Sequence, residues 1–174
     1  MDKILIVVDM QNDFIDGALG TKEAQSIVPN VVEKIETFDG DIFATFDTHT
    51  ADYVSTNEGR NLPIPHCIEG TLGWQLNELV NSALDKKGYT IVIKPTFGSV
   101  TLPEMIKSRY DVNNIEIELV GLCTDICVVS NALLLKAHFP EITISVDSSC
   151  CAGVTPETHA AALDTMRSCQ IKVR

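Results

Sequence analysis

Apolar runs of strand length alternate along the chain with segments in which apolar residues recur at helical spacing. The first run, Lys3 to Asp9, is an almost unbroken series of Ile, Leu and Val, which is typical of a parallel strand buried on both faces. From Ile27 to Phe38 the spacing of apolar residues predicts an amphipathic helix. The same pattern predicts further strands at Asp41–Asp47, Tyr89–Lys94, Ile115–Leu122, Ile142–Val146 and Ile171–Val173, and further helices at Trp74–Leu84, Leu102–Tyr110, Asp125–His138 and Thr158–Ser168.

This alternation predicts an α/β fold of three layers, in which helices cover both faces of a mostly parallel sheet and the crossovers are right-handed. The chain shows no internal repeat, no Pro/Ser-rich linker and no shift of composition, so we expect one domain over residues 1–174. The longest irregular stretch runs from Thr48 to Gly73. Loops of more than about 12–15 residues are uncommon in compact domains and are often functional.

Charge excludes two classes of partner. The 174 residues carry 24 Asp and Glu against 13 Lys and Arg, a formal net charge of −11. No cluster of basic residues reverses this locally, so we expect no nucleic-acid partner and no anionic membrane surface. A small molecule is the remaining class of ligand.

The cysteines and the start of the chain indicate a reducing compartment. Met1 runs straight into the first apolar strand without a basic segment and a small-residue cleavage site, and no apolar run approaches the roughly 20 residues that cross a bilayer. We therefore expect a cytoplasmic protein with mostly reduced cysteines. There are six of them: Cys67, Cys123, Cys127, Cys150, Cys151 and Cys169.

Chemically active side chains follow the predicted strands at their carboxyl ends. The first strand ends in Asp9, the second in Asp47, the third in Lys94, and the fourth runs into a segment that contains Cys123 and Cys127. In open α/β sheets ligands bind beyond the carboxyl ends of the strands. The sequence therefore predicts that an acid, an amine and a thiol meet at one edge of the sheet.

Cys127 is a candidate nucleophile. With Thr124 as the helix N-cap, Cys127 lies in the first helical turn, where free N–H groups and the helix dipole favour a thiolate, lower its pKa and can receive an oxyanion. Taken alone, Cys127 also fits a small buried core residue, and Cys123 with Cys127 also fits half of a zinc site that lacks a second pair. Together with Asp9 as the base and Lys94 as the stabilising cation, the thiol forms a Cys–Asp–Lys triad that needs no histidine.

The irregular stretch after the second strand contains a mixed set of oxygen and nitrogen donors. Asp47 and His49 are followed by Glu58 and His66, a set suited to Zn²⁺, Fe²⁺ or Mn²⁺. Spacing alone equally fits a polar loop with two unconnected histidines. Neither a Gly-x-Gly-x-x-Gly turn nor a Gly-x-x-x-x-Gly-Lys-Ser/Thr loop is present, so we expect no nucleotide cofactor.

Two motifs give the chain a specific resemblance. Ile6 to Phe14 (IVVDMQNDF) resembles the opening motif of the isochorismatase-like cysteine hydrolases, and Gly121 to Val128 (GLCTDICV) resembles their nucleophile motif. The resemblance extends from Ile4 to about Met166. It implies a six-stranded parallel sheet and a cis peptide bond between Leu122 and Cys123.

The resemblance also implies roles for individual residues. Cys127 matches the family's nucleophile, Asp9 its base and Lys94 the third member of its triad. The backbone N–H groups of Cys123 and Cys127 match the oxyanion hole.

Within this family, Asp47-x-His49 and the segment Pro65 to Thr71 resemble the nicotinamidases, which bind a divalent metal through Asp-x-His and a later His that matches His66. Ser55 occupies the place of a third histidine found in many members, and Glu58 matches the acidic ligand of others. Phe14 matches an aromatic residue that packs against the substrate ring. Pro63 stands where these enzymes often carry a tryptophan. Relatives assemble into dimers or larger forms, so a homo-oligomer is expected.

The leading hypothesis is therefore a nicotinamidase-type amidohydrolase. A second hypothesis is a related hydrolase that acts on another small amide or carbamoyl compound, with the Asp47/His49 loop merely structural. Cleavage of isochorismate is not favoured, because that vinyl-ether chemistry does not require the thiol of Cys127. A third hypothesis, a non-catalytic protein that responds to oxidation through Cys123, Cys127 and the Cys150–Cys151 pair, leaves Asp9 and Lys94 unexplained.

Overall fold

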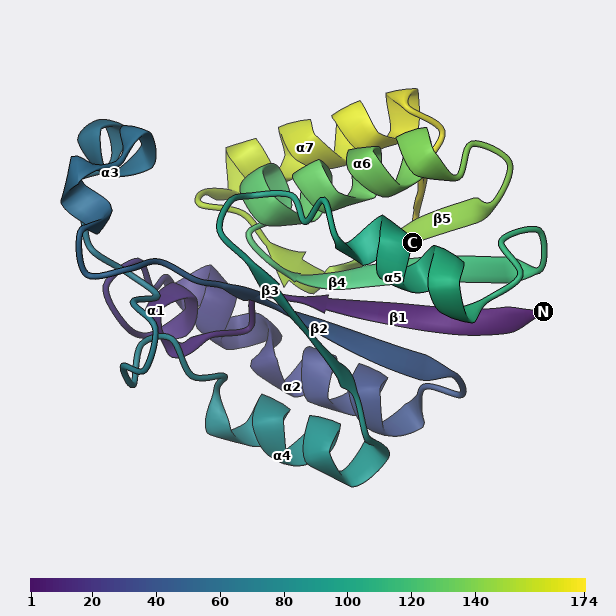
Figure 1. Cartoon of the computed structure of the whole chain (residues 1–174), viewed down its shortest axis with the longest axis horizontal. Helices are drawn as coiled ribbons and strands as arrows, with labels where there is room; N and C mark the ends of the chain where they lie inside the picture. Colours follow the sequence, from purple (N-terminus) through teal and green to yellow (C-terminus); the bar gives the residue numbers. More distant parts are fainter.

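The computed structural model describes all residues from Met1 to Arg174 and contains one sheet of six parallel strands (Figure 1). The strand order is β3-β2-β1-β4-β5-β6, and each neighbouring pair is parallel. This confirms the α/β fold with a parallel sheet. The strands are β1 (Asp2–Val8), β2 (Asp41–Asp47), β3 (Thr90–Lys94), β4 (Ile115–Leu122), β5 (Thr143–Ala152) and β6 (Lys172–Val173).

Helices cover both faces of the sheet, as the alternating pattern predicts. In Figure 1, α2 and α4 lie below the sheet, whereas α5, α6 and α7 lie above it. Each face has its own buried apolar cluster, and the continuous Ile/Leu/Val run of β1 contributes side chains to both clusters. The helices are α1 (Asn12–Ile15), α2 (Lys22–Thr37), α3 (Asn57–Asn61), α4 (Glu78–Lys87), α5 (Leu102–Arg109), α6 (Val129–His138) and α7 (Pro156–Ser168), with a 3₁₀ turn η1 (Tyr53–Ser55) and a π-helical turn η2 (Thr124–Val128).

The strand order reverses between β1 and β4, which lie side by side at the centre of the sheet. The chain proceeds from β1 outward to β2 and β3, and then from β4 outward to β5 and β6. Such a reversal opens a crevice at the carboxyl ends of the two central strands. Gly121 permits their close approach there, because it has φ of 116° and a Cβ at this position would lie 2.2 Å from the carbonyl oxygen of Val8.

Several predicted elements differ in their limits, among them the helix expected from Ile27, which begins at Lys22 because Thr21 caps it. The helix expected from Trp74 begins only at Glu78, because the side chain of Asn77 caps it and the backbone carbonyls of Trp74 and Gln75 accept hydrogen bonds from Gln11 and Asn12. β5 continues to Ala152 past a polar segment, at an irregularity in its pairing with β4. The helix expected from Asp125 is divided into η2 and α6.

The stretch from Thr48 to Gly73 is less irregular than the sequence pattern indicates, since it contains η1 and α3. None of the helices combines the length and the apolar character needed to cross a membrane.

Candidate active site

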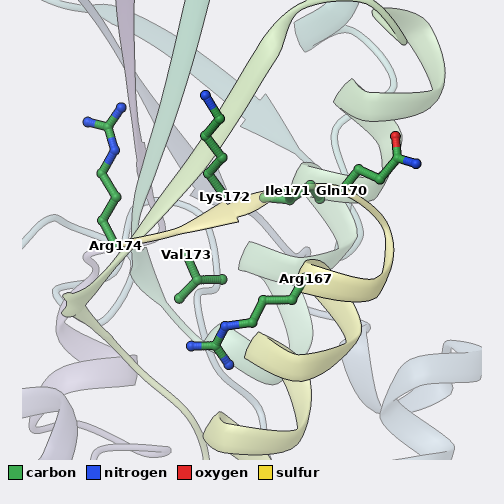
Figure 2. Close-up of a pocket in the computed structure, with 6 residues that line it drawn as sticks. All are labelled: Arg167, Gln170, Ile171, Lys172, Val173 and Arg174. Atoms are coloured by element: carbon green, nitrogen blue, oxygen red, sulfur yellow. The ribbon is translucent and has the colours of Figure 1, made fainter.

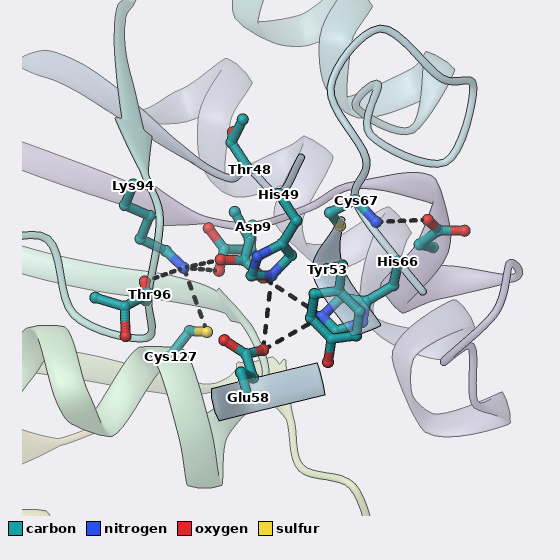
Figure 3. A network of polar contacts seen from close by, with 12 residues as sticks. Asp9, Thr48, His49, Tyr53, Glu58, His66, Cys67, Lys94, Thr96 and Cys127 are labelled. Carbon is teal, nitrogen blue, oxygen red and sulfur yellow. Dashed lines mark hydrogen bonds and ion pairs between the residues drawn. The ribbon is translucent and has the colours of Figure 1, made fainter. Parts of the chain in front are cut away.

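Lys94 is the centre of the candidate site. Its ammonium Nζ lies 2.6 Å from Oδ2 of Asp9, 3.2 Å from Oδ1 of Asp47 and 3.4 Å from Sγ of Cys127 (Figure 3). It also donates to the carbonyl oxygen of Thr96 at 3.1 Å. Asp9 and Lys94 are fully buried and Cys127 is 3% exposed. The three residues that the strand ends predict as a triad therefore do meet.

Backbone geometry directs each of these groups into the crevice. Asp9 follows β1 with φ of 46°, in the left-handed region that few residues other than glycine adopt. Its N–H donates to the carbonyl of Thr45, and its Oδ1 accepts a hydrogen bond of 2.6 Å from the hydroxyl of the same residue. Thr45 thus fixes the orientation of the carboxylate from the neighbouring strand β2.

Cys127 lies in η2, directly after β4. The peptide bond between Leu122 and Cys123 is cis, as the resemblance implies. The carbonyl of Cys123 accepts hydrogen bonds from the N–H groups of Ile126 and Val128, while no group of the chain accepts a hydrogen bond from the N–H of Cys123 itself. That N–H is therefore free to bind a ligand.

The prediction that Thr124 caps this helix is wrong. Cys123 is the cap residue and makes no side-chain capping bond, whereas the hydroxyl of Thr124 lies 2.8 Å from Nδ1 of His159 on α7. The expected lowering of the thiol pKa is also wrong for the resting site. Burial and the negative charge of Asp9 raise the pKa of Cys127 well above its usual value, although Lys94 opposes them. The resting thiol is protonated.

The other members of the group respond in the same way to burial and to charge. Burial raises the pKa of Asp9, and the nearby ammonium offsets only part of this effect. The pKa of Lys94 is raised, because Asp9, Cys127 and Asp47 together outweigh burial, so its ammonium stays charged. At rest the thiol is therefore neutral and the ammonium is charged, while burial disfavours the charge on the Asp9 carboxylate.

The second group of polar residues lies beside the first. Asp47, His49, Glu58 and His66 each offer one ligand atom, and these atoms lie within 4.8 Å of one another. Nε2 of His49 is 3.0 Å from Oδ2 of Asp47 and 3.6 Å from Oε1 of Glu58, and Nε2 of His66 is 3.6 and 3.7 Å from the same two oxygens. The interpretation of two unconnected histidines is excluded by this clustering.

These donors fit a divalent metal. Four ligands about 2.1 Å from a tetrahedral ion lie about 3.4 Å apart, close to the four separations given above. Nδ1 of His66 lies 2.8 Å from the carbonyl oxygen of Ile64, which can only accept, so this nitrogen carries the proton and Nε2 is free to bind an ion. Asp47 connects the two groups, because its Oδ1 contacts Lys94 and its Oδ2 contacts the histidines.

An aromatic residue that the sequence pattern does not reveal holds the two histidines. The ring of Tyr53 is fully buried, with its centroid 4.8 Å from that of His49 and 5.0 Å from that of His66. Its hydroxyl donates to the carbonyl of Leu62. Gly59, next to Glu58, packs so closely on this residue that a Cβ would lie 2.0 Å from the carbonyl oxygen of Tyr53.

The first motif also supports the metal-ligand segments. The side chain of Gln11 binds both the N–H and the carbonyl of Asp47, each at 2.8 Å. Oδ2 of Asp13 accepts a hydrogen bond of 2.8 Å from the N–H of Cys67, which adjoins His66 and has φ of 46°. Gln11 and Asp13 belong to the motif Ile6 to Phe14, but their partners lie 36 and 54 positions away in the sequence, so the motif alone does not reveal these contacts.

A small, mainly apolar pocket opens onto both groups. Phe14 lines it, as the resemblance implies, and its ring lies 5.5 Å from that of His66. Cys123 and Cys127 line one part of it, and Asp47, Glu58 and His66 line another. The remaining wall is apolar and comes from Leu19, Leu62, Phe97 and Ile126.

Two other hollows of the surface lack this chemistry. The one in Figure 2 lies beside β6, which pairs with the first half of β5, and Arg167, Lys172 and Arg174 line it. Arg167 and Arg174 are already paired with acidic side chains. A groove beside Trp74 holds neither the thiol nor the histidines. Trp74 itself packs on Phe46 and donates to the hydroxyl of Thr48.

Comparison with known proteins identifies the family of the chain. The family model described as the isochorismatase domain matches residues 3–174. The chain belongs to the isochorismatase domain family. Among curated members, it is 28% identical over 194 residues to the nicotinamidase/pyrazinamidase of Mycobacterium tuberculosis, covering 98% of this chain and 97% of that relative. It is 27% identical to a probable inactive nicotinamidase of Arabidopsis thaliana, covering 97% of this chain and 89% of that one.

Solved structures of family members share the fold over the whole chain. A nicotinamidase/pyrazinamidase from Bacillus subtilis superimposes with a TM-score of 0.87 at 29% identity and 99% coverage of both chains. A pyrazinamidase of Pyrococcus horikoshii in complex with zinc gives a TM-score of 0.81 at 28% identity, with 100% and 99% coverage. Because the relatives include one described as inactive, the activity of this member has to be argued from its own site residues.

Proposed function

We propose that this member of the family is a nicotinamidase-type amidohydrolase, which converts nicotinamide and water to nicotinate and ammonia through a thioester on Cys127. The observation that carries the proposal is the contact of Lys94 with both Asp9 and Cys127, where Cys127 lines the same pocket as Phe14. The names of the relatives from Mycobacterium tuberculosis and Bacillus subtilis support the same substrate class.

The chemistry begins with the neutral thiol. Asp9 takes the proton of Cys127 as the sulfur attacks the carboxamide carbon, and Lys94 stabilises the single negative charge as it passes from the carboxylate to the sulfur. The backbone N–H groups of Cys123 and Cys127 bind the tetrahedral oxyanion. Asp9 then returns the proton to the leaving nitrogen, and ammonia departs. The same carboxylate next activates a water molecule that hydrolyses the thioester and regenerates the thiol.

The remaining pocket residues orient the substrate. The ring of Phe14 offers an apolar face against which a flat heterocycle packs. We assign Asp47, His49, Glu58 and His66 as the ligands of a divalent metal ion, which when bound supplies a Lewis-acid contact for the ring nitrogen. The presence of zinc in the Pyrococcus horikoshii relative supports a divalent ion of this kind. The metal-ligand side of the pocket thus binds the ring nitrogen and the thiol side binds the carboxamide, so the pocket selects a ring that carries both groups.

Ammonia release from nicotinamide and a panel of other small amides tests the proposal. We expect release from nicotinamide by the natural protein, none by Cys127→Ala, and an undiminished rate in Cys169→Ala, which removes an exposed thiol at the end of α7. If the protein hydrolyses a different amide and leaves nicotinamide intact, that amide takes the place of nicotinamide as the proposed substrate. A Cys127→Ala variant as fast as the natural protein would overturn the mechanism.

Metal analysis tests the ligand assignment separately. We expect one equivalent of divalent metal in the purified protein, loss of that metal in His49→Ala, and retention in His138→Ala, which changes a histidine at the far end of α6. Equal metal content in the two variants would show that the four residues do not form the metal site.

A further inference from the structure

Asn131 on α6 is a buried polar residue that the proposed mechanism does not use. It is 1% exposed, and its side chain makes three hydrogen bonds. Its amide nitrogen donates to the carbonyl of Cys127 at 2.8 Å and to the carbonyl of Phe97 at 3.1 Å, while Oδ1 accepts from the N–H of Ser99 at 2.9 Å. The amide group thus joins the nucleophile's turn to the loop that follows β3.

That loop carries two parts of the site. Lys94 ends β3, and its ammonium binds the carbonyl of Thr96 in the first turn of the loop. Phe97, two residues before Ser99, presents its side chain to the pocket beside Cys127. Through its bonds to Phe97 and Ser99, Asn131 therefore holds the segment that begins at Lys94, and through Cys127 it holds the thiol.

We infer that Asn131 is a positioning residue that sets the separation of the Lys94 ammonium, the Phe97 wall and the Cys127 sulfur. The inference rests on the proposed function only for the turnover measured below. The separation of 3.4 Å between Nζ and Sγ lies between two elements that are distant in sequence. Reactive groups misplaced by about 1 Å can cost on the order of 10²-fold in rate.

A pair of variants distinguishes this role from ordinary helix stabilisation. Asn131→Ser retains a hydroxyl that can bond the carbonyl of Cys127 four residues earlier in the helix, but it is too short to reach Phe97 or Ser99. Asn131→Ala loses all three bonds. If the hydrogen bonds from Asn131 to Phe97 and Ser99 position the site, Asn131→Ser and Asn131→Ala lose the same amount of activity. The control is Asn81→Ala, which removes a half-buried asparagine on α4 whose side chain bonds only Asp85.

Turnover and thiol reactivity are measured together. We expect kcat/KM to fall about 10- to 100-fold in both Asn131 variants, mainly through kcat, and to be unchanged in Asn81→Ala. The rate of Cys127 alkylation by iodoacetamide at one fixed pH, followed by mass spectrometry, is expected to fall severalfold in both, while the exposed Cys169 of the same molecules reacts at its usual rate.

The alkylation measurement needs no substrate. If no amide is turned over by the natural protein, the proposed function fails while the alkylation rates still decide the role of Asn131. Recovery of the natural alkylation rate in Asn131→Ser, or a rate above the natural one in either variant, would overturn the inference. The inference is also overturned if both variants have a lower Tm but keep the natural turnover and alkylation rates at temperatures below it.

Discussion

The hydroxyl of Thr45 donates a hydrogen bond of 2.6 Å to Oδ1 of Asp9 and accepts one of 3.2 Å from the N–H of Asp9, and both can be removed almost without a change in shape. Thr45→Val replaces the hydroxyl by a methyl group, while Thr45→Ser keeps the hydroxyl and serves as the matched control. Both partners of the 2.6 Å bond are fully buried, so no water replaces the lost donor. A hydrogen bond to a charged group contributes about 1.5–3 kcal/mol, and we expect Thr45→Val to lower the free energy of unfolding by that amount near pH 8.

The loss should depend on pH in a defined direction. Burial raises the pKa of Asp9 above its unfolded value, and the hydrogen bond from Thr45 opposes that rise. A carboxyl with a raised folded pKa costs stability as the pH increases from the unfolded to the folded value. Removal of the Thr45 hydroxyl raises the folded pKa further, so the deficit of Thr45→Val relative to the natural protein should be smaller at pH 5 than at pH 8.

The same energy predicts a kinetic effect. Since 1.36 kcal/mol corresponds to one pH unit, the acidic limb of the kcat/KM profile should move toward higher pH by about 1–2 units in Thr45→Val, because Asp9 must be ionised to accept the thiol proton. Urea unfolding at the two pH values and ammonia release across the pH range provide the measurements. Identical stability and identical acidic limbs in Thr45→Val and Thr45→Ser would refute the reasoning.

Two further predictions concern the neighbours of this carboxylate. Lys94→Met should abolish turnover and lower the free energy of unfolding by about 3–5 kcal/mol in urea denaturation, because it leaves Asp9 and Asp47 as buried charges without their cation. Asp13→Ala should weaken metal affinity about 10- to 100-fold in a competition titration with a chromogenic chelator, because the N–H of Cys67 beside His66 loses its acceptor, whereas Asp16→Ala should leave that affinity unchanged.

Strand-end logic predicts the triad because it depends only on direction. Parallel strands bring their carboxyl ends to one edge, so Asp9, Lys94 and the Cys127 turn can be placed at that edge before the register of the strands is known. The supporting residue Thr45 has no such signature. Within DIFATFD it reads as an ordinary strand position, and its role arises from a register that places it opposite Val8 and one step before the sharp turn at Asp9.

Loop residues were harder to predict for a related reason. Spacing alone could not show that Glu58 and His66 approach the same point as His49, because a chain of this length between them can close in many ways. The structure closes it with η1, α3 and the buried ring of Tyr53, whose partners are two histidines and a backbone carbonyl. A tyrosine between Asp52 and Val54 in a loop gives no periodic pattern from which such burial could be inferred.

The two halves of the site share one side chain, and this determines how they can be tested. Oδ1 of Asp47 contacts Lys94, while Oδ2 contacts His49 and His66. Removing Asp47 would therefore take away a metal ligand and at the same time leave the buried ammonium with one carboxylate fewer. A loss of activity in such a variant could not be assigned to either half. His49 belongs to the proposed metal-ligand group but does not contact Lys94. Replacement of His49 therefore tests metal binding separately from thiol chemistry.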